Sequence, residues 1–221
     1  MGCAWWNSVI GVSWGERMNL YVVRHGQTWA NAEQRYLGAL DPELSETGVG
    51  QAHELCGRLP VRVDALVSSP LLRARQTADI LGIHLGLATC IVDGFRERNV
   101  GVFEGLTQQE ARQRHPDLWA RNITRQWNAA PPGGESIAQV VRRVHRALLE
   151  LEATWHSRNV VLVAHGFVAK TIRALALGDF SDFFQWQLPN AELLALQSLT
   201  LQAHALDVRH DPLSGAEQAR P

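Results

Sequence analysis

The chain has 221 residues, of which 46% are hydrophobic and 19% are charged, and its formal net charge is −1. This length fits a single domain, and the balanced charge without a long apolar span argues against nucleic acid or a membrane as the partner. The three cysteines, Cys3, Cys56 and Cys90, form no paired motif, which favours a reduced, cytoplasmic setting without a disulfide framework. Local arginines would therefore have to hold any anionic ligand.

The N-terminal segment Met1–Arg17 does not resemble a secretory signal, because it has no basic start and no clean apolar stretch, and it contains three tryptophans. Met18 directly precedes the first strong strand pattern. We expect Met18 to be the natural start, residues 1–17 to be a disordered extension, residues 18–208 to form one domain and residues 209–221 to be a flexible tail. The alternative is a genuine N-terminal segment whose tryptophans pack on the domain.

Hydrophobic periodicity and turn residues divide the chain into alternating strands and helices. In chain order the predicted elements are strand Leu20–Val23, helix Glu46–Leu59, strand Val63–Val67, helix Leu71–Leu81, a crossing strand within Ile83–Asp93, helices Thr107–His115 and Asp117–Trp127 broken at Pro116, helix Glu135–Trp155, strand Val160–Val163, helix Phe167–Leu177, and closing strands Ala191–Gln197 and Leu199–Asp207. Such alternation predicts an α/β fold with a sheet covered on both faces.

The most informative stretch is Asn19–Asn31, which reads NLYVVRHGQTWAN. Its run Leu20–Val23 predicts a strand buried on both faces of a sheet, because successive residues are apolar. Arg24, His25 and Gly26 follow directly, at the carboxyl end of the strand, where open α/β sheets bind ligands. An isolated Arg-His-Gly would more simply be a surface loop, so the interpretation depends on partners elsewhere in the chain.

A second strand-to-helix junction follows the same pattern. The predicted strand Val63–Val67 ends in Ser-Ser-Pro, and the next helix carries Arg73 and Arg75 in its first turns. A helix start with an arginine suits phosphate, because oriented N–H groups act together with a bidentate charged donor. Residues two apart do not share a helix face, so we expect one arginine to point at the site and Arg75 to lie in solvent.

The stretch Gly94–Gly105, GFRERNVGVFEG, is an irregular, glycine-punctuated loop that carries Glu97 and Glu104. A carboxylate in an otherwise apolar loop can be a desolvated acid with a raised pKa, which suits general acid-base chemistry. The alternative is a glutamate that pairs with Arg96 or Arg98.

A second His-Gly pair ends the predicted strand Val160–Val163, where Ala164, His165 and Gly166 precede an apolar helix. Either histidine alone would more often be an ordinary polar residue at a strand end. Two histidines in matching positions, with arginines at two of the three junctions, favour a shared site at the carboxyl edge of the sheet.

The chain resembles the histidine phosphatase superfamily, which has the phosphoglycerate mutase-like fold. The similarity rests on short motifs in the family's order, namely Arg24-His25-Gly26-Gln27-Thr28 with Asn31, Ser68–Ala78, Glu97 with Gly101 and Glu104-Gly105, Pro132–Ser136, and Ala164-His165-Gly166. The resemblance implies an α/β three-layer sandwich in which helices cover both faces of a mostly parallel central sheet.

The resemblance also implies that His25 is a nucleophile and forms a phosphohistidine that water hydrolyses. Catalytic roles then fall to His25, Glu97 and His165, with Glu97 as the proton donor and Glu104 as the alternative donor. Phosphate-binding roles fall to Arg24, Asn31, Arg73, Gly26, Thr28, Gly38 and Gly166. No metal and no cofactor is implied, because arginines neutralise the phosphate, and the nine histidines show no metal-ligand spacing.

The mutases of this superfamily place a tyrosine after the acidic residue and an asparagine after the second His-Gly, where this chain has Val100 and Phe167. The resemblance therefore favours a phosphomonoesterase that acts on a small molecule, with α-ribazole 5′-phosphate as one candidate substrate. Phosphoglycerate mutase-type transfer, a phosphohistidine-protein phosphatase and a non-catalytic phospho-ligand binder are the alternatives. Trp119, Trp127 and Phe103 could stack on a ring-bearing substrate or pack in the core. We expect a monomer or a homodimer.

Overall fold

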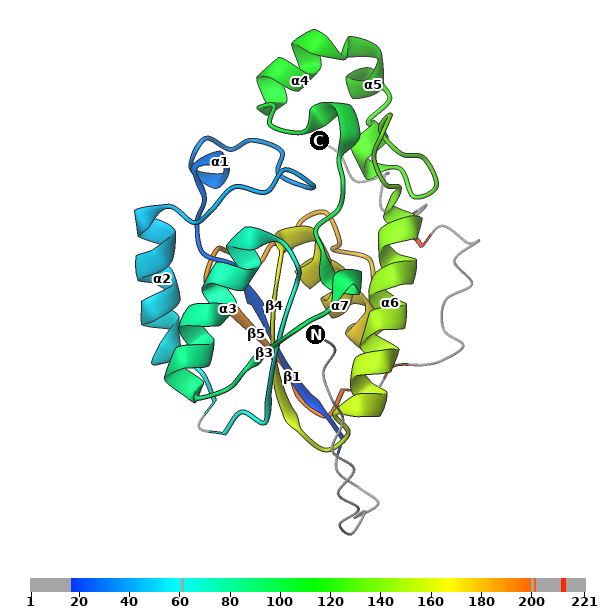
Figure 1. Cartoon of the computed structure of the whole chain (residues 1–221). Helices are drawn as coiled ribbons and strands as arrows, with labels where there is room; N and C mark the ends of the chain where they lie inside the picture. Colours follow the sequence, from blue (N-terminus) through cyan, green and yellow to red (C-terminus); the bar gives the residue numbers. More distant parts are fainter. Residues whose placement is uncertain (1–16, 61, 200, 202–211, 214–221) are drawn as a thin grey trace.

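A five-stranded sheet forms the centre of the computed structural model, which describes residues 17–60, 62–199, 201, 212 and 213 (Figure 1). Across the sheet the strands lie in the order β3 (Thr89–Ile91), β2 (Ala65–Ser68), β4 (Asn159–Ala164), β1 (Asn19–Arg24) and β5 (Leu193–Leu196). Parallel pairing joins β3, β2, β4 and β1, whereas β5 runs antiparallel to β1. The sheet is therefore mostly parallel, as predicted.

Helices cover both faces of this sheet (Figure 1). One face carries α2 (Glu46–Cys56) and α3 (Leu72–Leu85), and the other carries α6 (Ile137–Thr154) and α7 (Gly166–Leu177). Alternate strand residues point to opposite faces, so Val22 and Leu162 pack in the α6 and α7 cluster, whereas Val23 and Val163 pack in the α2 and α3 cluster. This three-layer arrangement confirms the predicted fold class and explains the unbroken apolar runs in β1 and β4.

The register of the parallel strands brings three strand ends to one edge of the sheet. Arg24 lies opposite Ala164, and Ser68 lies opposite Val163. The hydrogen bonding between neighbouring strands continues for one residue beyond β1 and β2. The N–H of His25 donates to the Ala164 carbonyl at 3.1 Å, and the N–H of Ser69 donates to the Val163 carbonyl at 3.0 Å. The residues that follow β1, β2 and β4 therefore meet.

Short elements lie beyond this edge. They are α1 (Trp29–Ala32), α4 (Gln108–Arg114), α5 (Pro116–Ala120) and the 3₁₀ turns Gly101–Phe103 and Ile123–Arg125, whereas the 3₁₀ turn Asp93–Phe95 packs against α6 in the main core. In Figure 1, α4 and α5 sit above the carboxyl end of the sheet, and a separate apolar cluster of Phe103, Leu106, Ala111 and Ile123 holds this segment together. The segment is placed to cover a ligand bound at the strand ends.

The strand expected within Ile83–Asp93 is confirmed as β3, but the ends of two helices were predicted wrongly. The helix predicted to end at Leu81 continues as α3 to Leu85 and stops at Gly86, whose φ of 65° suits a residue without a side chain. The helix expected over Asp117–Trp127 stops with α5, after which Asn122 has a φ of 52° and a 3₁₀ turn follows. In both places a residue with a left-handed backbone follows the helix, and the apolar spacing did not show where the helix ends.

Other expectations concern parts of the chain outside the described residues. These are the extension 1–17 except Arg17, the tail 209–221 except residues 212 and 213, and most of the closing strand Leu199–Asp207. Leu199 and Leu201 are described, and both are buried outside any strand. No helix in the described ranges is both long and apolar enough to cross a membrane.

Candidate active site

Two histidines meet at the carboxyl edge of the sheet. His25 follows β1 and His165 follows β4, and their ring centroids lie 5.1 Å apart with the ring planes at 61°. Both side chains are buried. The parallel register of β1 and β4 produces this proximity, so the structure brings together the two His-Gly pairs that the sequence singled out.

The two ring nitrogens of His25 have different surroundings. Nδ1 lies 2.7 Å from the carbonyl oxygen of Gly26, and because a carbonyl only accepts, Nδ1 carries the hydrogen. Nε2 accepts from the Nε–H of Arg73 at 3.3 Å, so Nε2 bears a lone pair. Burial, followed by the charges of Arg73 and Arg24, holds the pKa of His25 well below its usual value. The imidazole is therefore neutral near pH 7 and competent as a nucleophile.

The loop that carries His25 is held on several sides. Gly26 packs so closely on α2 that a Cβ would overlap the carbonyl oxygen of Gly48, and its N–H donates to the Thr77 hydroxyl at 3.1 Å. The side-chain amide of Asn190 donates to the carbonyl oxygen of His25 at 3.0 Å. These contacts fix the direction of the imidazole, and the predicted phosphate-binding role of Gly26 stays a prediction.

Arg73 reaches the site from the first turn of α3. Its side chain has no exposed surface, and it donates to the carbonyl oxygens of Gly38 at 3.0 Å and Leu40 at 2.8 Å as well as to His25. Its Nη1 also pairs with Oδ1 of Asp41 at 3.5 Å, so of the five N–H donors of the guanidinium the second one on Nη2 is left for a ligand. Arg75 is exposed, as expected for the second arginine of the pair. Gly38 contributes a backbone carbonyl that orients Arg73.

Arg24 approaches the same space from the end of β1. Its Nη1 donates to the Leu188 carbonyl at 2.8 Å, while its Nε is buried without a partner among the described residues. Gly166, at the start of α7, lies beside the Arg24 guanidinium, and a Cβ there would be in ordinary contact with it, 3.5 Å from the guanidinium carbon. A buried donor without an acceptor costs free energy unless a ligand supplies one.

The two glutamates of the irregular loop have different surroundings. The Glu97 carboxylate accepts from the N–H of Arg98 at 2.9 Å and from the N–H of Phe167, in the first turn of α7, at 3.1 Å. The Glu104 carboxylate instead accepts from the backbone N–H groups of Gly38, Ala39, Leu40 and Val100. Glu104 therefore organises the loop that holds Arg73, and Glu97 is the better candidate for proton transfer.

Thr28 and Asn31 form the cap of α1. The Thr28 hydroxyl accepts from the N–H of Asn31 at 3.3 Å, and Oδ1 of Asn31 accepts from the N–H and the hydroxyl of Thr28. Asn190 also donates to this Oδ1, at 3.3 Å. The Thr28 hydroxyl is therefore used in capping α1. The side-chain amide nitrogen of Asn31 is the group of that residue that can donate to a ligand.

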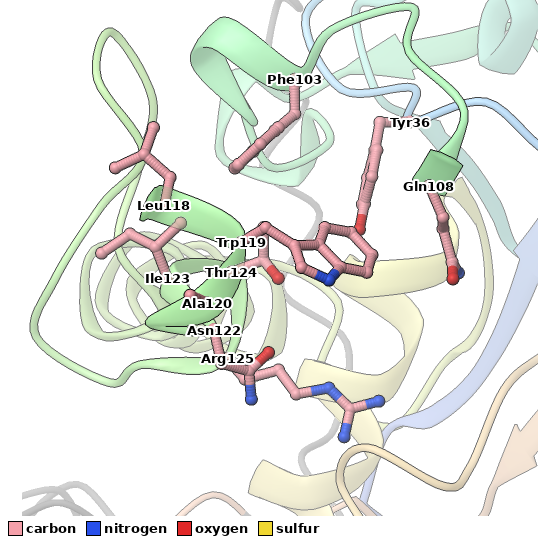
Figure 2. A pocket seen from close by; sticks show the side chains of 10 residues that line it. All are labelled: Tyr36, Phe103, Gln108, Leu118, Trp119, Ala120, Asn122, Ile123, Thr124 and Arg125. Atoms are coloured by element: carbon pink, nitrogen blue, oxygen red, sulfur yellow. The ribbon is translucent and has the colours of Figure 1, made fainter. Parts of the chain in front are cut away.

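Two adjoining cavities lie beside the site, which the first of them reaches at Arg24. One of about 400 Å³ is lined by Arg24, Asn31, Gln34, Arg35, Tyr36, Gln108 and Asn190. A second, of about 450 Å³, is lined by the residues in Figure 2 and shares Tyr36 and Gln108 with the first. Figure 2 shows the indole of Trp119 in the middle of this lining, with Phe103 and Tyr36 on one side and Arg125 on the other. Neither lining includes His25, Arg73 or His165, so the cavities adjoin the buried histidines, with Arg24 in the first cavity and Trp119 in the second.

The aromatic residues named from the sequence have different environments. Phe103 and Trp127 are buried in apolar clusters, at 1% and 2% exposure. Trp119 is only half-buried and lines the second cavity. Packing accounts for Trp127, and Phe103 both packs and contributes one wall.

Three residues at the site were missed from the sequence. Ser69 lies 2.7 Å from a ring nitrogen of His165, and Asn190 contacts the His25 loop. Lys170, the single lysine of the chain, is buried on α7 beside the rings of Phe167 and Phe183. Burial lowers the pKa of Lys170 to about 8. A lone lysine in an apolar helix was a visible signal, whereas nothing in the local sequence distinguished Asn190.

Among the described residues, no group of three or more His, Cys, Asp or Glu side chains could hold a metal ion. The guanidinium groups of Arg73 and Arg24 lie close enough to lower the pKa of both histidines, and the chemistry they suit is the binding of a phosphoryl group.

Comparisons with known proteins agree with this geometry. Residues 20–206 match the model of the histidine phosphatase superfamily (branch 1). The bifunctional protein Rv2228c of Mycobacterium tuberculosis is 37% identical over 165 residues, which are 74% of this chain and 45% of that protein, so the chain spans about half the length of this relative. Other relatives are named as a phosphoserine phosphatase and as phosphoglycerate mutase-like.

Solved structures lead to the same family. Mycobacterial glucosyl-3-phosphoglycerate phosphatase is 33% identical, with a TM-score of 0.72 over 81% of this chain and 89% of that chain. The α-ribazole phosphatase from Shigella flexneri shares the fold, with a TM-score of 0.73 at 24% identity over 85% of this chain and 97% of that chain. The family match extends across nearly all described residues, and the chain belongs to the histidine phosphatase superfamily.

Proposed function

We propose that this protein is a metal-independent phosphomonoester hydrolase that works through a phosphohistidine on Nε2 of His25. The observation that carries the proposal is the hydrogen bond of His25 Nδ1 to the Gly26 carbonyl, because it leaves the opposite nitrogen with a lone pair. The lowered pKa of His25 supports the same role, since protonation would remove that lone pair.

In the first step, Nε2 of His25 attacks phosphorus while the bond to the leaving oxygen breaks. Glu97, in its protonated form, gives its proton to that oxygen, and the alcohol leaves. In the second step, Glu97 takes a proton from water as the water oxygen attacks phosphorus. The phosphorus–nitrogen bond breaks, its electron pair returns to Nε2, and inorganic phosphate is released.

Arg24, Arg73 and His165 would stabilise the phosphoryl oxygens as the transition state forms. Phosphoryl transfer depends on positioning and charge stabilisation, and the buried Nε of Arg24 and the remaining N–H on Nη2 of Arg73 are donors of that kind. Asn31 would add a neutral donor from the wall of the adjoining cavity. Gly38 would act by placing Arg73, and Thr28 by capping α1. Gly166 lies beside Arg24 at the start of α7, and we propose it as a phosphate-binding residue.

The substrate we propose is a small phosphomonoester with a bulky leaving group. His25 has only 2% of its surface exposed, so a phosphate must reach it through a narrow space, while the Trp119 cavity offers about 450 Å³ for the rest of the molecule. α-Ribazole 5′-phosphate is one candidate. A phosphorylated glycoside of the kind named for the mycobacterial relative is another.

Hydrolysis of a panel of phosphomonoesters in the presence of a chelator tests the proposal. The panel contains p-nitrophenyl phosphate, α-ribazole 5′-phosphate, 3-phosphoglycerate and glucosyl-3-phosphoglycerate, and native protein is compared with His25→Ala. We expect turnover that persists in chelator and disappears with His25→Ala. Phosphate binding by folded native protein without any turnover would instead support a binding protein.

A further inference from the structure

The contact between Ser69 and His165 has a single satisfactory arrangement of hydrogens. Oγ of Ser69 lies 2.7 Å from Nε2 of His165, and both residues have no exposed surface. Nδ1 of His165 is buried and has no partner among the described residues. Two hydrogen placements can join Ser69 to His165, with either the hydroxyl or the imidazole as the donor.

The other contact of Ser69 decides between them. Its Oγ accepts from the N–H of Leu71 at 3.3 Å, which uses the oxygen as an acceptor. No acceptor other than His165 Nε2 lies within hydrogen-bonding distance of this hydroxyl in the described chain. If Nε2 carried the hydrogen, the buried hydroxyl proton would be unsatisfied, at a cost of about 1–3 kcal/mol. The hydroxyl therefore donates to Nε2.

The hydrogen of a neutral His165 is then on Nδ1. Burial, followed by the charges of Arg73, His25 and Arg24, holds the pKa of His165 well below its usual value, so the resting ring is neutral. A neutral ring that accepts at Nε2 must donate at Nδ1, and this is the buried nitrogen that lacks a partner.

We propose that Ser69 is a positioning residue that holds neutral His165 in its Nδ1–H tautomer, so that His165 donates this hydrogen to a phosphoryl oxygen. The proposal rests on the proposed function, because it assigns a phosphoryl group to the space beside Nδ1. Without the Ser69 hydroxyl, a neutral His165 can place its hydrogen on Nε2 and turn a lone pair toward the anion, which would repel it.

The two histidines of the site thus share one tautomer with opposite consequences. A backbone carbonyl fixes Nδ1–H in His25 and exposes a lone pair for attack. A serine hydroxyl fixes Nδ1–H in His165 and presents a donor. One nitrogen attacks phosphorus and the other stabilises its oxygens, although both rings are neutral.

Nitrogen NMR of protein labelled in its histidine rings tests the tautomer directly. Spectra of native protein at pH 7.5 are compared with those of Ser69→Ala, and the His165 signals are assigned by their loss in His165→Asn. Ser68→Ala is the matched control, because Ser68 is the adjacent buried serine and donates to the Ser69 carbonyl without contacting His165. We expect a protonated Nδ1 in native protein and in Ser68→Ala, and a mixture of tautomers in Ser69→Ala.

Kinetics with p-nitrophenyl phosphate test the consequence. We expect kcat/KM to fall about 10-fold to 100-fold in Ser69→Ala, less than the roughly 10²-fold to 10³-fold for the loss of an oriented donor, because part of the His165 rings keep the hydrogen on Nδ1. In Ser68→Ala it should change less than about 3-fold. Inhibition by vanadate should weaken in parallel. A protonated Nε2 in native protein, or an unchanged kcat/KM in Ser69→Ala, would overturn the role of Ser69 while leaving the phosphatase proposal intact. Absence of turnover by native protein would overturn the phosphatase proposal, and the donation step with it.

Discussion

The Nε of Arg73 lies 3.3 Å from Nε2 of His25, so the side chain that would bind the phosphoryl group also contacts the proposed attacking atom. The other two guanidinium nitrogens of Arg73 donate to the carbonyl oxygens of Gly38 and Leu40. A planar fork with three fixed contacts holds its remaining donor in a defined direction. The loop that follows α1 is thereby coupled to the nucleophile through a single residue.

Replacement of Arg73 by lysine should lower kcat/KM for p-nitrophenyl phosphate by about 10²-fold to 10³-fold, because an ammonium cannot hold the loop carbonyls and the phosphoryl oxygens together. Arg75→Lys is the matched control, since Arg75 lies on the same helix but is exposed. Steady-state kinetics of both variants provide the measurement. Nearly native kcat/KM in Arg73→Lys would mean that Arg73 acts only through its charge, and comparable losses in the two variants would point to a general disturbance of α3.

Replacement of Glu97 by glutamine should slow the departure of poor leaving groups most, because an amide cannot supply a proton. We expect a loss of about 10²-fold or more in kcat for alkyl phosphates and a much smaller loss for p-nitrophenyl phosphate. The measurement is kcat across esters of graded leaving-group pKa. An equal loss for every ester would remove Glu97 from the role of proton donor.

Replacement of Glu104 by glutamine should lower the stability of the protein without changing how kcat depends on the leaving group. The Glu104 carboxylate accepts hydrogen bonds from four backbone N–H groups in two loop segments. A hydrogen bond to a charged group contributes about 1.5–3 kcal/mol to stability. We expect the free energy of unfolding to fall by about 1–3 kcal/mol, as measured by urea denaturation. A variant of native stability with the kinetic signature expected of Glu97→Gln would reverse the roles of the two glutamates.

The sequence predicted the site residues that directly follow a buried strand. Arg24, His25 and His165 follow buried apolar runs, and parallel strands bring their carboxyl ends to one edge, so the local pattern sufficed. Arg73 was predictable for a similar reason, since it opens the helix after a third strand. The layers of the fold were predictable because β1 and β4 are apolar at successive positions.

The rest of the site depends on contacts that no local pattern encodes. Asn190 and the His25 carbonyl that it contacts are 165 positions apart in the chain. A single side chain that donates to a distant loop carbonyl does not produce a repeating sequence pattern, so it could not be predicted. The Ser-Ser-Pro motif was visible, yet only the geometry shows that Ser69 contacts His165 while Ser68 turns to a backbone carbonyl. Glu97 and Glu104 stand in one irregular loop, and their different partners come from the packing of α7 and of residues 38–40.

Trp119 should contribute to the binding of large leaving groups. Its indole lines the cavity of about 450 Å³ next to the phosphate site (Figure 2), and an aromatic contact contributes about 0.5–1.5 kcal/mol beyond buried area. Trp119→Ala should raise KM for ring-bearing esters by about 3-fold to 10-fold and leave 3-phosphoglycerate nearly unaffected. The comparison of KM for these two classes of ester in native protein and variant checks this. A uniform change would indicate a role in folding of the α4 and α5 segment.

Stability should decrease as the pH falls below the ordinary pKa of histidine. Burial lowers the pKa of both His25 and His165 in the folded protein, so the unfolded chain takes up their protons first, and the free energy of unfolding decreases below pH 6.5. Between pH 7.5 and 5.5 each of the two histidines should lower the free energy of unfolding by about 1.4 kcal/mol. In His165→Asn, the decrease in the free energy of unfolding that the two rings cause should be about half as large. The control is His84→Asn, which changes an exposed histidine on α3 and should leave this decrease unchanged. Urea denaturation at the two pH values measures this, and an undiminished pH dependence in His165→Asn would mean that His165 is already charged in the folded protein.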